Sequence, residues 1–116
     1  MSLEATEKEC AANAVAPRVS LSDIEGEIAQ RHTFTAGEAL LSMDVLSAAN
    51  VGSPLHILTV CILVMNNGFV VIGKSAPASP ENFNAELGKK LAYEDCIRQL
   101  WPLMGFALRD KLSEAA

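Results

Sequence analysis

The feature that most constrains this 116-residue chain is a long stretch without a formal charge. There is no Asp, Glu, Lys or Arg between Asp44 and Lys74, so residues 45–73 are uncharged. Two apolar runs lie within this stretch, Leu55–Met65 and Phe69–Ile72. Because charge is absent where apolar side chains are dense, the stretch predicts a buried part of a fold, a membrane span or an interface.

A membrane-spanning helix needs about 20 consecutive apolar residues. Pro54, His56 and Asn66-Asn67-Gly68 interrupt the uncharged stretch, and its longest apolar piece, Leu55–Met65, is too short to cross a bilayer. The N-terminus is acidic, whereas a targeting segment is basic at this place. We therefore expect no membrane partner.

The two apolar runs predict a β-hairpin. Asn67-Gly68 suits a two-residue type I′ turn, because both turn positions need positive φ. With that turn, the predicted pairs are Asn66 with Phe69, Met65 with Val70, Leu63 with Ile72 and Val60 with Ser75. Since residues on both faces of the first strand are apolar, we expect both faces to be covered.

A long helix is predicted to begin at Ser79-Pro80, with the serine as cap and proline at the first position, and to end near Leu100 before Pro102. Its apolar residues lie on two sides. One side holds Phe83, Leu87, Leu91 and Trp101, and the other Ala92, Tyr93, Cys96 and Leu100. A domain with one hairpin can hardly cover both sides, so we infer that a second chain covers one of them.

Shorter helices are predicted elsewhere. Capping-box spacing at Ser22/Glu25 predicts a helix over residues 23–31, and the same spacing at Thr35/Glu38 predicts one over residues 36–42. The alternative to the second helix is a strand that begins at residues 43–46. A last helix is expected over residues 102–114, broken or unbroken at Gly105. Residues 1–19 are interpreted as a disordered or loosely helical arm. The fold class is therefore α+β: an antiparallel hairpin or small sheet, a long C-terminal helix and short helices, in a single oligomeric domain over residues 20–116.

The composition excludes several classes of protein. Half of the residues are hydrophobic, which excludes an intrinsically disordered chain. The net charge is −5, and Lys89-Lys90 is the one adjacent pair of cations, so we expect no duplex nucleic acid as partner. The three cysteines have no Cys-x-x-Cys spacing, which favours reduced thiols in a cytoplasm.

No pattern typical of an enzyme is present. His32 and His56 have no metal-ligand spacing to other donors, so we expect no metal. Gly73-Lys74-Ser75 lacks the first glycine and the following helix of a phosphate-binding loop. Cys61 and Cys96 are expected to be inert buried thiols. We predict a protein without catalysis and without a cofactor.

Cations beside aromatic rings form the candidate binding site. Lys90, Glu94 and Arg98 are spaced by four on the long helix, and they are either simple surface ion pairs or part of a groove for a phosphorylated ligand with a base. A base would stack on Phe69 or Phe83, and the phosphate would meet cations or the amides near residues 79–82. The full set of candidate ligand-binding residues is Phe69, Lys74, Ser75, Asn82, Phe83, Lys89, Lys90, Tyr93 and Arg98.

The second half of the chain contains a series of short motifs. In chain order they are Asn67-Gly68-Phe69, Val71-Ile72-Gly73-Lys74-Ser75-Ala76, Pro80-Glu81-Asn82-Phe83-Asn84, Gly88, Ala92-Tyr93-Glu94-Asp95, and Leu100-Trp101-Pro102-Leu103 with Gly105. With these motifs, about residues 55–112 resemble a family of small tailed-phage proteins named for gene products 49 and 66 of two enterobacterial phages. The arm and residues 34–51 do not follow the family pattern.

That family is similar to the first type of Thoeris anti-defence protein. Those are phage proteins without catalysis that form symmetric oligomers and sequester cyclic ADP-ribose-type signals, and in some members cyclic oligonucleotides, made by bacterial immune enzymes. The resemblance implies a cyclic nucleotide signal as ligand, a homo-oligomer such as a dimer or dimer-based hexamer, and a place in the host cytoplasm during infection. The alternative is a phage protein that binds a host protein through residues 45–73.

Overall fold

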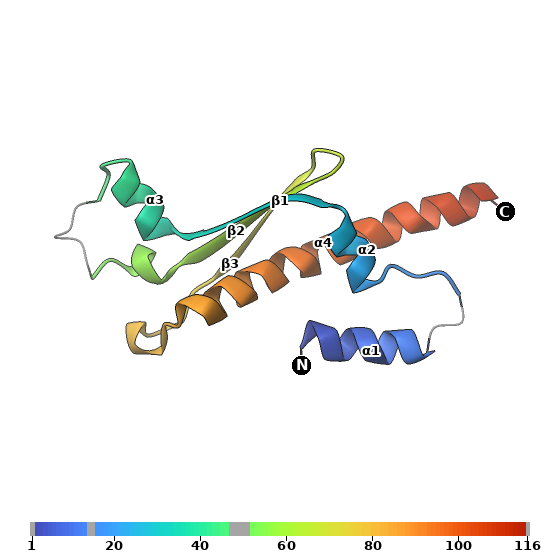
Figure 1. Ribbon diagram of the computed structural model, residues 1–116, viewed down its shortest axis with the longest axis horizontal. Helices are drawn as coiled ribbons and strands as arrows, with labels where there is room; N and C mark the ends of the chain where they lie inside the picture. The colour runs from blue at the N-terminus through green and yellow to red at the C-terminus, as the bar shows by residue number, and fades with distance from the viewer. Residues whose placement is uncertain (1, 14–15, 47–51, 116) are drawn as a thin grey trace.

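The computed structural model describes residues 2–13, 16–46 and 52–115. Its elements follow the order α1 (Leu3–Asn13), α2 (Leu21–Gly26), β1 (Ile28–Thr35), α3 (Ala36–Ser42), η2 (Pro54–Ile57), β2 (Thr59–Met65), β3 (Val70–Ser75), η3 (Pro80–Asn82) and α4 (Ala85–Ala115). The three strands form one antiparallel sheet in the order β1-β2-β3. Figure 1 shows α4 running along one face of this sheet and continuing beyond it to the C-terminus. The predicted α+β class is confirmed.

The central strand β2 has one covered face and one open face. Thr59, Cys61, Leu63 and Met65 alternate along β2 and are buried, whereas the residues between them are half-buried. Across the sheet, Val70 and Ile72 of β3 lie on the open face and remain about half exposed, at 50% and 59%. Within the part of the chain that the structure describes, the prediction that both faces are covered is therefore wrong. Residues 47–51 of the uncharged stretch lie outside the described residues.

The predicted hairpin forms, but its register is one residue away from the predicted one. Val64 pairs with Val70, Leu63 with Val71 and Thr59 with Ser75. The Gly68 amide donates to the Met65 carbonyl at 2.9 Å, and of the turn residues only Gly68 has a positive φ, at 88°. The loop therefore has three residues, and the last of them is the left-handed glycine. Three-residue loops of this kind are common in hairpins, after the two-residue ones. The extra residue shifts every cross-strand pair by one.

Residues predicted as one helix over 23–31 divide between α2 and β1. The capping box of α2 uses Ser20 and Asp23, not Ser22 and Glu25: the Ser20 hydroxyl accepts from the Asp23 amide at 3.0 Å. From Ile28 onward the chain pairs with β2, with Ile28 opposite Met65. The prediction of a helix to residue 31 is wrong because β2 needs a second neighbour for its backbone groups, which local helical spacing does not reveal.

The helix predicted over residues 36–42 is confirmed as α3. Its capping box is the predicted one, in which the Thr35 hydroxyl accepts from the Glu38 amide and the Glu38 carboxylate accepts from the Thr35 amide. Residues 43–46 form turns and not a strand. α3 packs on η2, where Gly37 lies so close to His56 that a Cβ atom would be 2.9 Å from the His56 Cα.

The long helix starts later and ends later than predicted. Ser79 precedes only the short helix η3 and makes no capping hydrogen bond with its side chain. At the start of α4 the Asn84 side chain accepts from the Leu87 amide at 3.1 Å. α4 then continues through Pro102 and Gly105 as one helix, so the predicted end near Leu100 and the separate helix from residue 102 are wrong. Proline in a helix removes one backbone hydrogen bond. Pro102 is exposed, and its neighbour Trp101 is held by a hydrogen bond to the Val19 carbonyl.

Small residues let β3 approach α4 closely. A Cβ atom at Gly73 would overlap the Ala92 carbonyl oxygen and lie 2.8 Å from the Cys96 nitrogen. The Cys96 thiol donates to the Cys61 carbonyl at 3.4 Å, and burial raises the pKa of Cys96 to about 12. Cys61 and Cys96 are buried and free, as predicted.

Side chains of α4 also cover the outer edge of β3. The Asp95 carboxylate accepts from the Lys74 amide at 3.0 Å, and the Gln99 side chain donates to the Ile72 carbonyl at 2.8 Å. These two bonds satisfy backbone groups that no further strand pairs with.

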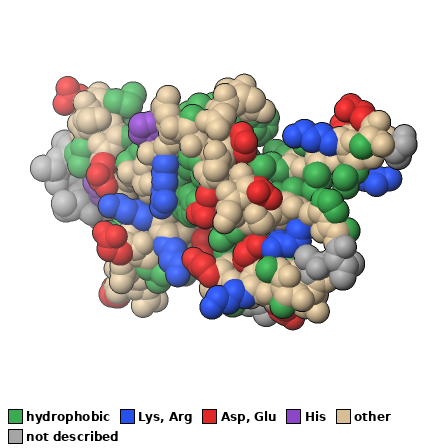
Figure 2. Space-filling view, turned by 45° about the vertical axis from the view of Figure 1, so that its right-hand side comes forward, with side chains coloured by type: hydrophobic (Ala, Val, Ile, Leu, Met, Phe, Trp, Pro, Cys, Tyr) green, Lys and Arg blue, Asp and Glu red, His purple; other side chains and the backbone are tan. Residues whose placement is uncertain are grey.

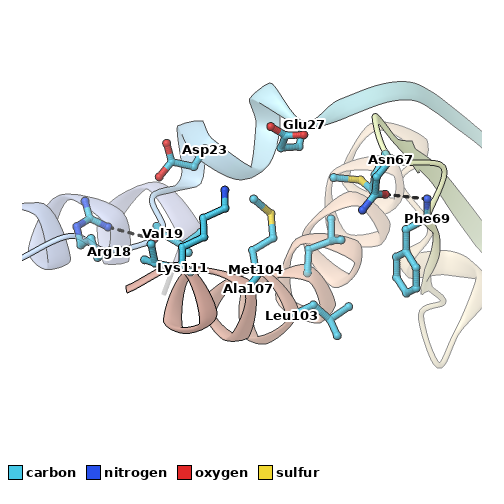
Figure 3. Close-up of a pocket in the computed structure, with 13 residues that line it drawn as sticks. Arg18, Val19, Asp23, Glu27, Asn67, Phe69, Leu103, Met104, Ala107 and Lys111 are labelled. Carbon is cyan, nitrogen blue, oxygen red and sulfur yellow. Dashed lines mark hydrogen bonds between the residues drawn. The ribbon is translucent and has the colours of Figure 1, made fainter. Parts of the chain in front are cut away.

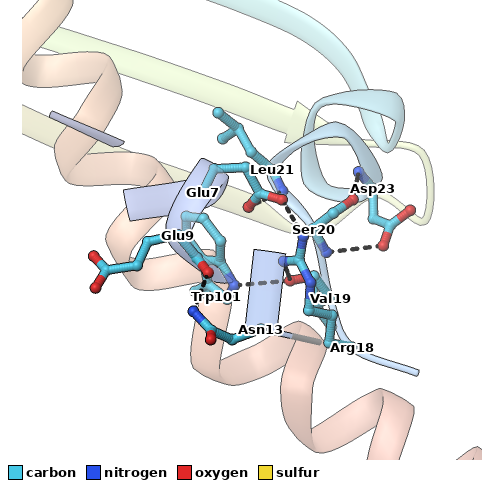
Figure 4. A network of polar contacts seen from close by, with 9 residues as sticks. All are labelled: Glu7, Glu9, Asn13, Arg18, Val19, Ser20, Leu21, Asp23 and Trp101. Atoms are coloured by element: carbon cyan, nitrogen blue, oxygen red, sulfur yellow. Dashed lines mark hydrogen bonds and ion pairs between the residues drawn. The ribbon is translucent and has the colours of Figure 1, made fainter. Parts of the chain in front are cut away.

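The N-terminal segment is attached to this body by polar contacts (Figure 4). Arg18 pairs with Glu7 of α1 at 2.5 Å, and the Trp101 indole donates to the Val19 carbonyl at 3.2 Å. The hydrogen bond from Arg18 lowers the pKa of Glu7. Residues 3–13 are helical; the division into an arm over 1–19 and a domain over 20–116 stays a prediction, and residues 1, 14 and 15 of that arm lie outside the described residues.

No helix in the described ranges has the length and apolar character that a membrane span requires.

The Gly73–α4 contact yields a stability prediction. Gly73→Ala should lower the free energy of unfolding by about 1–3 kcal/mol, because the methyl group overlaps backbone atoms of α4. Gly105→Ala is the matched control: a Cβ atom there meets nothing within 4 Å, so the substitution should raise helix stability by about 0.5–1 kcal/mol. Urea denaturation followed by circular dichroism measures both. Equal effects of the two substitutions would contradict the close approach.

Candidate functional site

Three of the predicted cations lie exposed on α4. Lys89 pairs with Glu86 at 3.9 Å, and Arg98 pairs with Asp95 at 3.8 Å, both with a spacing of three residues. Such exposed pairs contribute about 0.2–1 kcal/mol each, so they leave the cations available to a ligand. Lys90 lies on the same helix and is exposed.

Apolar side chains separate these cations along α4. Leu87 and Leu91 are 49% and 39% exposed, in the part of the helix that carries Lys90 and Arg98. The spacing of these four residues places them on one stripe of the helix. We call Leu87, Lys90, Leu91 and Arg98 the α4 strip. A planar apolar group with phosphates is the kind of ligand that such a strip can contact.

The other predicted residues near the start of α4 have mixed environments. Phe83 is half-buried and Asn82 is exposed, and both precede α4. Residues 80–82 form the three-residue helix η3, with Ser79 as its N-cap. The amides at the start of α4 are therefore those after Asn84, and not the predicted ones. Lys74 projects from the open face of the sheet, and Ser75 ends β3 opposite Thr59.

Tyr93 is part of a contact between three elements. Its hydroxyl donates to the Glu25 carboxylate of α2 at 2.7 Å, and the guanidinium of Arg31 from β1 stacks 3.9 Å above its ring. Burial and the hydrogen bond to Glu25 raise the pKa of Tyr93 far above its usual value. The sequence analysis missed Glu25 and Arg31, because it placed both on one predicted helix.

A groove lies at the opposite end of the sheet from the start of α4. It has a volume of about 590 Å³ between α2, the hairpin turn and the C-terminal half of α4. Figure 3 shows Lys111 rising from α4 on the side of Asp23 and Glu27, with Phe69 at the other end of the groove. The floor is apolar and consists of Met65, Leu100, Leu103, Met104, Ala107 and Leu108.

The groove contains Phe69 but none of the other predicted site residues. Arg18, Asn67 and Lys111, which line it, were missed. Asn67 was predicted only as a turn residue, and Arg18 and Lys111 lie in segments interpreted as an arm and as a last helix. Leu103, which lines the groove with Phe69, lies about 20 Å along α4 from Lys90 and about 7.5 Å from Arg98, at 1.5 Å per residue. Along the helix, Phe69 is therefore remote from Lys90 and closer to the Arg98 end of the α4 strip.

Figure 2 shows the C-terminal end of α4 projecting from the body, with basic and acidic side chains near its tip and hydrophobic side chains beside it. In the described ranges, no three His, Cys, Asp or Glu side chains gather as metal ligands.

Comparisons with known proteins give one match. Residues 19–112 match the phage protein family described as N4 Gp49/phage Sf6 gene 66. No curated protein matches the chain. No solved structure matches it either.

The Tyr93 contact can be tested by titration, since the chain contains one tyrosine. In the folded protein the phenol should ionise well above its ordinary pKa of about 10. Because the folded pKa is raised, the stabilisation from protonated Tyr93 is present below pH 10 and is lost as the pH rises above it. Near-ultraviolet absorbance follows the phenolate directly. Glu25→Gln should lower the midpoint and Tyr93→Phe should remove the signal; a wild-type midpoint at the ordinary value would contradict the contact.

Proposed function

The chain belongs to the N4 Gp49/phage Sf6 gene 66 family of phage proteins, and from that premise we propose that it is a non-catalytic homo-oligomer that sequesters a cyclic nucleotide immune signal. The ligand class is a cyclic ADP-ribose-type molecule or a cyclic oligonucleotide. The similarity to the first type of Thoeris anti-defence protein supports this class. The protein would act in the host cytoplasm during infection, by binding the signal and not by turning it over.

The observation that carries this proposal is the α4 strip. Leu87 and Leu91 are exposed there beside Lys90 and Arg98, and the ion pair of Arg98 with Asp95 is long and lies at the surface. A phosphate that approaches Arg98 competes with Asp95, whose carboxylate also accepts from the Lys74 amide. Asp95 can therefore release Arg98 and keep a hydrogen-bond partner.

The separation of Phe69 from Lys89 and Lys90 favours binding between chains. About 20 Å of helix lies between Lys90 and Leu103, which lines the groove with Phe69, and this is longer than a cyclic mononucleotide. If Phe69 stacks on the base while Lys89 or Lys90 holds the phosphate, the two groups come from different copies. A homo-oligomer is therefore part of the proposal, and its site lies at a chain–chain interface.

Titration calorimetry tests this function. Cyclic ADP-ribose isomers and cyclic di- and trinucleotides should be titrated into the purified protein, and at least one should bind. Arg98→Ala should weaken binding about 10- to 100-fold, the equivalent of one charge-assisted hydrogen bond to phosphate. Lys8→Ala, which removes an exposed cation from α1, is the control and should bind like the wild type. No heat with any of these ligands would end the proposal.

A second function is favoured by the open face of the sheet. Val70 and Ile72 are half exposed there, beside half-buried Val60, Ile62 and Val64. Exposed apolar patches of this kind mark protein interfaces. The alternative is therefore that the protein binds a host protein through this face.

Affinity capture separates the two functions. If the open face binds a host protein, one host protein should be captured in a fixed ratio, and Ile72→Lys should abolish its capture without changing nucleotide binding. Ile72 is 59% exposed, so the substitution should leave the fold intact, as thermal denaturation would check. Capture that Ile72→Lys does not alter would exclude the open face as the binding surface.

A further inference from the structure

The apolar stripe of α4 that faces the sheet continues beyond the end of the sheet. Ala92, Cys96 and Leu100 of this stripe are buried under the strands. One and two turns later, Leu103 and Ala107 occupy the same side of the helix. They form the floor of the groove, where the hairpin turn has ended and no strand covers them.

The groove has the shape and lining for a helix. Its floor residues follow the spacing of three and four that one helix presents to another, at positions 100, 103, 104, 107, 108 and 111. Its two walls are α2 and the hairpin turn, which leave a trough along α4 (Figure 3). A strand added here would have no sheet edge to pair with.

Charges at the rim favour a partner that carries both signs. Asp23 and Glu27 lie on the α2 side of the groove, and Arg18 and Lys111 lie on the same rim. Arg18 is paired with Glu7, and Asp23 caps α2, so the local charge is nearly balanced. A polyanion would meet two carboxylates at this place, and a polycation would meet two basic groups.

The chain itself contains a helix that fits this description. The C-terminal half of α4 is about 22 Å long from Trp101 to Ala115 at 1.5 Å per residue. It projects beyond the sheet (Figure 1) and exposes Leu103 and Phe106, at 50% and 72%. Basic and acidic residues alternate near its end, in the order Arg109, Asp110, Lys111 and Glu114.

We infer that the groove is filled by the C-terminal half of α4 from a second copy of this chain. The two helices lie antiparallel about a two-fold axis, so that each copy fills the groove of the other. Ala107 is the smallest side chain on the floor and lies nearest the axis, where it lets the helices approach closely. On either side of the axis, Leu103 of each copy faces Lys111 of the other, whose apolar stem packs on it.

This inference rests on the homo-oligomeric state in the proposed function, and it names one interface of the oligomer, separate from the cations of the α4 strip. The interface forms without a nucleotide. The test is therefore made on ligand-free protein, and failure of the interface can be told apart from failure of nucleotide binding.

Molar mass by light scattering is the first measurement. The wild type should have the mass of a dimer or of a multiple of a dimer, and Leu103→Asp should halve it. Met43→Asp is the control, since Met43 is 67% exposed at the C-cap of α3 and does not line the groove. It should keep the wild-type mass. Circular dichroism and thermal denaturation should show that both variants remain folded.

Cross-linking is the second measurement, and it does not depend on a disruptive substitution. In a Cys10→Ser background, which removes the exposed native thiol, Ala107→Cys should give a covalent dimer on mild oxidation, because the two thiols meet at the axis. Met43→Cys in the same background should remain uncross-linked. A monomeric wild type, a mass changed by Met43→Asp and not by Leu103→Asp, or cross-linking at position 43 alone would each overturn the inference.

Discussion

The close packing of β3 on α4 is the contact on which the rest of the structure depends. Gly73 has no side chain where the Ala92 carbonyl and the Cys96 nitrogen approach, and Gly88 lies equally close to Thr59 of β2. Only small residues allow a helix to lie this near a strand. With α4 in this position, Asp95 and Gln99 reach the outer edge of β3 and satisfy its backbone, so the sheet needs no fourth strand on that side.

The same packing decides which apolar surfaces stay uncovered. One helix covers one face of the sheet, so the other face exposes Val70 and Ile72. The sheet covers α4 only as far as Leu100, so the second half of the helix exposes Leu103 and Phe106. The apolar residues of the described segments are thus divided between the buried layer and exposed surfaces, which include the open face, the α4 strip and the projecting helix. The proposed interfaces lie on these exposed surfaces.

The site residues show how far local patterns reach. Spacing along one helix correctly places Lys90 and Arg98 together, because helical geometry alone brings residues four apart onto one side. Phe69 was grouped with them only by residue type, and the structure places it in the groove with Leu103, about 20 Å along α4 from Lys90. Glu25, Arg31 and Tyr93 are brought together from three elements far apart in the chain. No spacing in the sequence could indicate that contact.

The sequence by itself determined the α+β class, the hairpin, the α3 helix with its capping box, and the excess of apolar surface. These follow from turn chemistry, capping and periodicity, all of which act over a few residues. The tertiary structure decided the one-residue shift of the hairpin register, the conversion of residues 28–31 into β1, and the passage of α4 through Pro102. The last two involve a partner distant in the chain: β2 for β1, and Val19 for Trp101 beside the proline. The register follows from the three-residue turn with its left-handed Gly68. Local preference was overridden there because satisfying and burying the backbone of a whole layer outweighs the preference of a single residue.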